Sequence, residues 1–187
     1  MENLDAPTPD LSATPPPPFW NSVLKFSLYG GVALIFFSLA TYVMDMNMMS
    51  IVAGIVAFLV TLGIAVGTGV LAIQNQRTLD GGYMAFGRAF VIGGLAIAIS
   101  ILLYSIWNYI LITIIDPEYI TRLKEQFLEQ WGENIPEDAM GEALKGFDDA
   151  ASICTAVKNG VIGVVFNGLI GGLISAAIGK KNPPAQF

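Results

Sequence analysis

Four long uncharged runs of mostly apolar residues constrain the fold of this chain more than any other feature. They cover residues 26–44, 46–76, 89–115 and 159–179. Each run can hold the roughly 20 apolar residues that a helix needs to cross a bilayer. Lipid offers the backbone no hydrogen-bond partner, so a spanning segment must be a helix or part of a closed barrel. Because the first and last runs lack the alternating polarity of barrel strands, we expect an all-α membrane protein with four transmembrane helices, at about 21–44, 50–74, 88–115 and 153–179.

The composition agrees with this class and narrows the chemistry. Hydrophobic residues make up 54% of the chain and charged residues only 13%, whereas a soluble protein carries about a quarter charged residues. The chain has no histidine and one cysteine, Cys154, which excludes a Cys/His zinc site and an intrachain disulfide. We therefore expect no enzyme, no cofactor and no metal site. We interpret Cys154 as a small packing residue, with lipidation or intermolecular pairing as the alternative.

The four spans form a single predicted transmembrane domain, residues 21–180, between two tails. Residues 1–20 hold six of the ten prolines and no basic residue, which predicts a disordered tail with a polyproline II end. Residues 181–187 form a short C-terminal tail. The start of the chain lacks the basic residues and the cleavage site of a signal peptide, so we expect the first span to be an uncleaved anchor.

The longest polar stretch, residues 116–151, separates the third and fourth spans. Asp116 and Pro117 are typical of a helix start, as N-cap and first helical residue. Apolar residues including Phe127 and Trp131 then recur on one helical face. The stretch carries ten acids against three bases, a balance of −7. We predict an extramembrane amphipathic helical hairpin, with Phe127 and Trp131 as candidates for a partner surface.

Basic residues near the span ends indicate the orientation. With four spans, the two termini and the connection between the second and third spans share one side. That side carries Lys25, Arg77, Arg88, Lys180 and Lys181, all close to span ends. On the other side four basic residues are outnumbered by acids. Because basic residues favour the cytoplasm, we expect both termini inside, these five residues as inner-side anchors, and the acidic hairpin outside.

Small residues recur at four-residue spacing in three of the runs. The pairs are Gly63 and Gly67, Ala89 and Gly93, and Gly168 and Gly172. Helices associate in lipid through close packing, which small residues permit. We interpret all six as helix-packing positions inside the bundle, with a homodimer face as the alternative.

Two asparagines lie at matching depth in the third and fourth runs. Asn108 lies eight residues before Asp116 and Asn167 nine residues after Lys158, so both lie about 12–13 Å below the outer boundary. We expect a buried polar pair, whose hydrogen bond stabilises the bundle by about 0.6 to 2 kcal/mol. A solute-binding pair is the alternative. The centres of the runs carry no charge, which argues against a proton-coupled pump.

The acidic stretch also bears on the expected partners. Its acidic pairs, Glu137–Asp138 and Asp148–Asp149, lack the spaced ligands and central glycine of a calcium loop, so we expect a solvated face. A negative outer segment also argues against binding of nucleic acid. The expected partners are membrane lipid and either a second copy of the chain or another membrane protein.

Two short motifs carry a family resemblance. The third span is preceded by DGGYMAFGRAF at residues 80–90 and ends in IIDPEY at residues 114–119. With four spans and a polar segment before the last, the chain from about Lys25 to Lys180 resembles the bacterial membrane family called domain of unknown function 4199. The resemblance implies a bacterial inner-membrane protein. It brings no established activity, so no catalytic residue carries over.

Three functional hypotheses follow. The first is a non-enzymatic accessory subunit or homo-oligomer that acts through helix packing and the acidic hairpin. The second is a small oligomeric transporter or channel for a solute or ion, favoured by the asparagine pair and by a two-plus-two repeat of Phe26 with Gly30-Gly31 and Phe90 with Gly93-Gly94. The third, a membrane enzyme, is disfavoured by the lack of histidine.

Overall fold

The computed structural model describes residues 18–47, 49–150 and 152–181, apart from the side chain of Glu137. These residues form six α-helices, one π-helical turn and no β-strand, which confirms the all-α prediction. The predicted tails lie outside the described residues, except for Pro18–Trp20 and Lys181.

Four helices are long and apolar enough to cross a membrane, as expected. They are α1 (Trp20–Val43), α2 (Ile51–Leu79), α3 (Phe86–Ile110) with its π-helical continuation η1 (Leu111–Ile115), and α6 (Ile153–Gly179). α2 continues to Leu79, beyond the predicted end at residue 74, because its polar last turns find hydrogen-bond partners on neighbouring elements.

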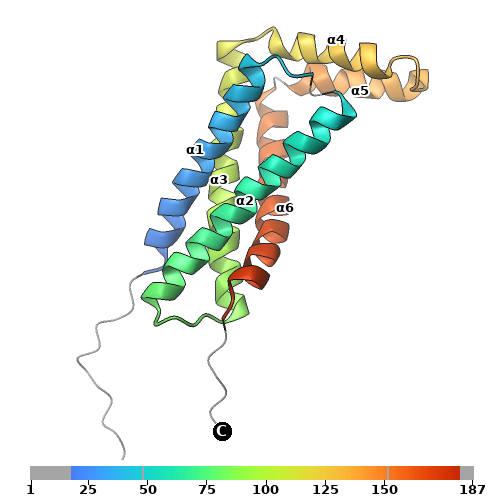
Figure 1. Cartoon of the computed structure of the whole chain (residues 1–187). Helices are drawn as coiled ribbons and strands as arrows, with labels where there is room; N and C mark the ends of the chain where they lie inside the picture. Colours follow the sequence, from blue (N-terminus) through green and yellow to red (C-terminus); the bar gives the residue numbers. More distant parts are fainter. Residues whose placement is uncertain (1–17, 48, 151, 182–187) are drawn as a thin grey trace, which may run out of the picture.

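The four spans form a bundle with two distinct ends (Figure 1). α1 begins and α6 ends at one end, which we call the termini end. The two shorter helices, α4 (Tyr119–Trp131) and α5 (Glu137–Ala150), lie across the other end. α3 is the most buried span, since 39% of its most apolar window is buried, against 28% for α1, 22% for α6 and 11% for α2.

The core is concentrated toward the termini end. The larger cluster joins all four spans there and consists of Val23, Ala72, Ile73, Met84, Ala89, Ile92, Ala96 and Ala176. A smaller cluster extends it toward α4 and α5 and consists of Leu34, Ala65, Ile97 and Ile101. The buried residues of α2 begin only at Ala65. The first half of α2 therefore diverges from the bundle, as its oblique course in Figure 1 shows.

Glycines let α3 and α6 touch through their backbones. A Cβ added at Gly172 would lie 2.9 Å from the Cα of Gly94, and one added at Gly94 would lie 3.1 Å from the carbonyl oxygen of Gly168. A Cβ at Gly93 would lie 2.8 Å from Cδ1 of Ile73, and Ala89 is fully buried. Four of the six predicted packing positions thus lie at contacts between helices.

Gly63 and Gly67 lie on the other face of α2. A Cβ added at either would meet nothing within 4 Å, so the prediction that this pair packs inside the bundle is wrong. The reason is helical phase. At about 100° per residue, both glycines fall on the side of α2 opposite its buried residues, which are Ala65, Thr68, Gly69, Ala72, Ile73 and Gln76.

A polar network joins α1 and α2 to the connection that follows α2. The Ser22 hydroxyl donates to Oε1 of Gln76 at 2.8 Å, and Nε2 of Gln76 donates to Oδ1 of Asp80 at 3.0 Å. Arg88 pairs with the same carboxylate, with 3.0 Å between Nη2 and Oδ2. Gln76 is fully buried, and a buried amide is stable only with such partners. The network helps to close the termini end.

The five predicted anchors all lie at or near the termini end. Arg88 belongs to the network above, and Nη1 of Arg77 donates to the carbonyl oxygen of Gly179 at 2.8 Å. The three lysines lie over aromatic rings, Lys25 over Phe26, Lys180 over Phe86 and Lys181 over Tyr83, at 5.6–5.8 Å from the ring centroids. Lys181 also pairs with Met84 in an isolated antiparallel bridge.

The corner between α3 and α4 contains a π-helical turn that the sequence analysis did not predict. The backbone N–H of Asp116 donates to the carbonyl oxygen of Leu111, five residues back, at 2.9 Å. α4 then begins at Tyr119, so the predicted start at Pro117 is wrong. The π-turn turns the chain at Asp116, and the helix begins only after this corner.

Candidate functional site

A cavity of about 460 Å³ lies between α2, α3 and α6 where these helices diverge, beneath α4 and α5. We call it the vestibule. Its polar lining side chains are Thr61, Tyr104, Ser105, Asn108, Tyr109, Tyr119, Asn159 and Asn167. Within the described part of the chain, its lining includes no charged residue. Amides, hydroxyls and phenols at this depth are costly in lipid and typical of functional sites.

Both predicted asparagines line this vestibule. Asn108 projects from α3 and Asn167 from α6. They do not hydrogen-bond to each other as predicted: Nδ2 of Asn167 donates to the carbonyl oxygen of Gly163 in its own helix, at 2.8 Å. Asn108 makes no side-chain hydrogen bond to any described residue. The prediction of one depth is also wrong: Ser105 lies opposite Gly160 and Ala98 opposite Gly168, so Asn167 lies about 14 Å from the level of Asn108 along the helix axes. Both amides line the same cavity and keep hydrogen-bonding capacity for another group.

Ser105 and Gly160 form part of the wall between α3 and α6 beside the vestibule. A Cβ added at Gly160 would lie 3.6 Å from the Cβ of Ser105. The Ser105 hydroxyl donates to the carbonyl oxygen of Ile101 at 2.8 Å, so its oxygen is left as an acceptor. The small residues thus let the two helices approach closely beside the polar cavity.

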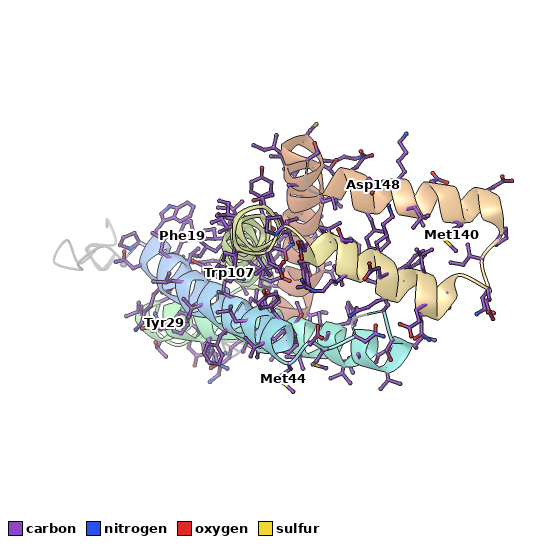
Figure 2. The ribbon with its side chains drawn as sticks, turned by 90° about the horizontal axis from the view of Figure 1, so that it is seen from above. Phe19, Tyr29, Met44, Trp107, Met140 and Asp148 are labelled. Carbon is purple, nitrogen blue, oxygen red and sulfur yellow. The ribbon has the colours of Figure 1, made fainter. Side chains whose placement is uncertain are left out.

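The roof of the vestibule is formed by α4 and α5. Ile120 and Leu123 of α4 and Ala150 of α5 line the cavity. Seen from above in Figure 2, the two helices extend side by side away from the spans, with Asp148 on α5. Nζ of Lys124 pairs with Oδ1 of Asp148 at 2.8 Å. The apolar face predicted for α4 is therefore directed in part at the vestibule.

The two residues predicted for a partner surface have partners within the chain. The ring of Phe127 packs on Phe147 of α5, with 5.4 Å between the centroids. The indole N–H of Trp131 donates to the carbonyl oxygen of Met49 at 3.3 Å. Neither ring is fully exposed. The sequence pattern predicted the apolar face of α4 correctly. It did not predict which residues contact this face, because α4 reaches across to the start of α2.

A second cluster holds the other end of α4. The Tyr42 hydroxyl at the end of α1 donates to Oδ2 of Asp116 at 2.9 Å. Arg122 binds the same carboxylate with both terminal nitrogens, and its guanidinium lies 5.7 Å from the ring centroid of Tyr119. The roof is thus attached at the Asp116 corner and at Trp131.

Electrostatics reinforce the attachment at the corner. The hydrogen bond from Arg122 lowers the pKa of Asp116 below its ordinary value, and the same contact raises the pKa of Arg122. Burial raises the pKa of Tyr119, which lines the vestibule as a neutral phenol. The cluster therefore stays as an ion pair beside neutral donors across the physiological pH range.

Other candidate chemistry lies away from the vestibule. Cys154 is exposed, so its interpretation as a packing residue is wrong; it lies in the first turn of α6. The described residues contain no group of three or more Cys, Asp or Glu that could hold a metal ion. The acidic residues of α4 and α5 are instead spread along two helices.

Two functional features were missed at the sequence level. The Tyr42–Asp116–Arg122 cluster was not predicted, because Tyr42 and Asp116 are 74 residues apart in sequence. The tyrosines that line the vestibule, Tyr104, Tyr109 and Tyr119, were not singled out either. Their spacing of five and ten residues matches no regular helical face, and the π-turn between them accounts for part of that mismatch.

Comparison with known proteins identifies one family. The sequence model of a family described as a protein of unknown function (DUF4199) matches residues 25–181. No curated protein and no solved structure matches the chain.

Proposed function

This chain belongs to the DUF4199 family of proteins of unknown function, and we propose that it is a multi-pass membrane protein that binds a hydrogen-bonding ligand in the vestibule. The proposed role is binding without covalent catalysis. The observation that carries it is the presence of Asn108 and Asn167 on one cavity between two spans. Small-molecule sites have volumes of about 300–1,000 Å³, and the vestibule falls within this range.

The chemistry of the lining indicates the kind of ligand group. Asn108, Asn159 and Asn167 offer both amide donors and carbonyl acceptors, and the tyrosines add hydroxyls. Such groups pair best with neutral hydroxyls, amides or water. We therefore infer that the ligand presents a neutral polar group to the vestibule.

The arrangement of charges supports an orientation. The five basic residues lie near the termini end, and the segment of α4 and α5 carries the excess of acids. Because basic residues favour the cytoplasmic side, we propose that both termini are cytoplasmic in a bacterial inner membrane. In this orientation α4 and α5 form an extramembrane amphipathic hairpin on the periplasmic side. The vestibule then lies in the outer half of the bilayer.

A second candidate function is assembly, as an accessory subunit or as a homo-oligomer that encloses a transport path. The observation in its favour is the open face of α2, where an added Cβ at Gly63 or Gly67 meets nothing within 4 Å. Open space at a glycine pair permits another helix to approach closely. Native mass spectrometry after gentle solubilisation tests this role: substituting Leu at both glycines should dissociate an oligomer or heterologous complex. A monomer in the unsubstituted protein would contradict it.

Native mass spectrometry also tests the binding role, at a mass resolution that detects a bound small molecule. We expect the unsubstituted protein to retain a non-protein mass that Asn167→Leu loses. Phe166→Leu is the matched control, since Phe166 lies at the same depth of α6 but is 60% exposed and does not line the vestibule. Retention of the same mass by all three proteins, or by none, would contradict the proposal.

A further inference from the structure

Two apolar hollows lie along the seam between α3 and α6, outside the vestibule. The hollow nearer α4 and α5, which we call the outer hollow, has a volume of about 370 Å³, and the second, nearer the termini end, about 360 Å³. They share Val164 and Val165 as lining residues. Residues 102–109 of α3 and 153–165 of α6 supply the lining of the outer hollow. Together the hollows form a groove along two spans.

The outer hollow adjoins the vestibule. Four residues line both: Ser105, Tyr109, Ala156 and Gly160. Three of them have small side chains, so little separates the apolar hollow from the polar cavity. A molecule with a polar head and an apolar chain fits this pairing of surfaces.

The surroundings of the groove are apolar. Leu102, Ile106 and Val161, which line the outer hollow, are 49%, 52% and 57% exposed. On a helix long and apolar enough to cross a membrane, such side chains face hydrocarbon, and the molecules that reach them are lipids. From Leu102 to Tyr109 the helix rises about 10 Å, within one leaflet of a hydrocarbon core about 30 Å thick.

We propose that the ligand of the vestibule is a membrane lipid with an uncharged, hydroxyl-bearing headgroup. The headgroup binds in the vestibule, whose lining includes Asn108, Asn167 and the tyrosine hydroxyls, and one acyl chain lies in the outer hollow between α3 and α6. This assignment rests on the proposed binding function and names the class of its ligand. The neutral amide and hydroxyl lining pairs with hydroxyl groups of the headgroup, and the adjoining hollow accounts for an apolar chain.

A photoactivatable diacylglycerol tests the proposal. The probe carries a diazirine on one acyl chain and is incorporated at low fraction in phosphatidylcholine nanodiscs that hold the full chain. Irradiation followed by peptide mapping should place the label on the outer-hollow residues of α3 and α6. Asn167→Leu should reduce this labelling about fivefold, the effect of losing one net hydrogen bond, whereas Phe166→Leu should leave it unchanged.

A second probe tests the proposal on the unsubstituted protein, so its result does not depend on whether a variant folds. The same diacylglycerol with its hydroxyl acetylated should label the unsubstituted protein several-fold less. Equal labelling by both probes, or label spread evenly over all exposed apolar residues, would overturn the proposal.

One further outcome separates this inference from the proposed function. If the unsubstituted protein retains a water-soluble mass that Asn167→Leu loses, while neither lipid probe labels the outer hollow, the binding function stands and the lipid assignment falls. If no mass depends on Asn167 and the lipid probes also fail, both fall.

Discussion

The crossing of α3 and α6 gives the sharpest prediction about stability. At Gly172 a Cβ would lie 2.9 Å from the Cα of Gly94 and 3.2 Å from its nitrogen. Carbon atoms in contact are ordinarily about 3.5–4.0 Å apart, so Gly172→Ala must push the two backbones apart by up to about 1 Å. Both neighbours are backbone atoms in helices and cannot rotate away.

The magnitude follows from the general cost of overpacking. Extra atoms forced into a packed core destabilise by about 1–3 kcal/mol. Alanine also stabilises a helix by up to about 1 kcal/mol relative to glycine, which offsets part of that cost. Gly67→Ala gains the same helical preference but meets nothing within 4 Å. The difference between the two variants therefore isolates the contact, and we expect Gly172→Ala to be less stable than Gly67→Ala by about 1–3 kcal/mol.

The assay is reversible unfolding in mixed micelles, followed by circular dichroism as the fraction of denaturing detergent increases. Both variants and the unsubstituted chain are measured at low protein concentration, so that association does not contribute. Stabilities of Gly172→Ala and Gly67→Ala that agree within about 0.5 kcal/mol would refute the backbone contact between α3 and α6. A larger loss for Gly67→Ala would reverse the assignment of the buried face of α2.

Three further predictions concern the polar contacts. Gln76→Leu should destabilise the bundle by about 1–3 kcal/mol, because it leaves buried hydrogen-bonding groups without partners; Gln74→Leu, at an exposed position, should cost little in the same unfolding assay. Asp116 has a pKa below its ordinary value of 3.8, so its ionised form stabilises the fold above that value and the contribution is lost as pH falls through the lowered pKa. Asp116→Asn should therefore lower Tm at pH 7 and flatten the decline in Tm below pH 4; an unchanged decline would contradict this reasoning. Trp131→Phe, which removes the N–H donor to the Met49 carbonyl, should increase the rate at which a protease cleaves between α4 and α5, and an unchanged rate would argue against attachment of the roof there.

The spans were predictable because length and lack of charge alone identify a helix that crosses a bilayer. The packing of the spans against one another was not predictable, because lipid and protein core are equally apolar and the sequence shows no contrast between buried and exposed faces. The pairs Gly63–Gly67 and Gly168–Gly172 look alike in sequence. They differ in the helix face that carries them: Gly63 and Gly67 lie on the face of α2 opposite its buried residues, whereas Gly168 and Gly172 contact the backbone of α3.

The residues of the site were predictable in part, but their relative depth was not. Counting residues from the polar boundaries predicted one depth for Asn108 and Asn167, and that prediction is wrong, although both residues line the vestibule. They do not bond to each other because Ser105 lies opposite Gly160 and Ala98 opposite Gly168, so that Asn167 lies about 14 Å deeper than Asn108 along the helix axes. The attachment of α4 at Asp116 involved Tyr42, far away in sequence, and a π-turn without a recognisable sequence signal.

The central proposal is that the vestibule is a polar binding site beneath α4 and α5 that water reaches from the side of these two helices. Its most direct test is the reaction of Asn167→Cys with a membrane-impermeant maleimide in intact cells, in a Cys154→Ser background that removes the exposed native thiol. Phe166→Cys, one residue away at the same depth but 60% exposed to the apolar surroundings, is the control. Rapid labelling of Asn167→Cys from the outside, with Phe166→Cys unlabelled, is the predicted result. Equal labelling of the two cysteines, or labelling of Asn167→Cys only after the cells are opened, would contradict the account.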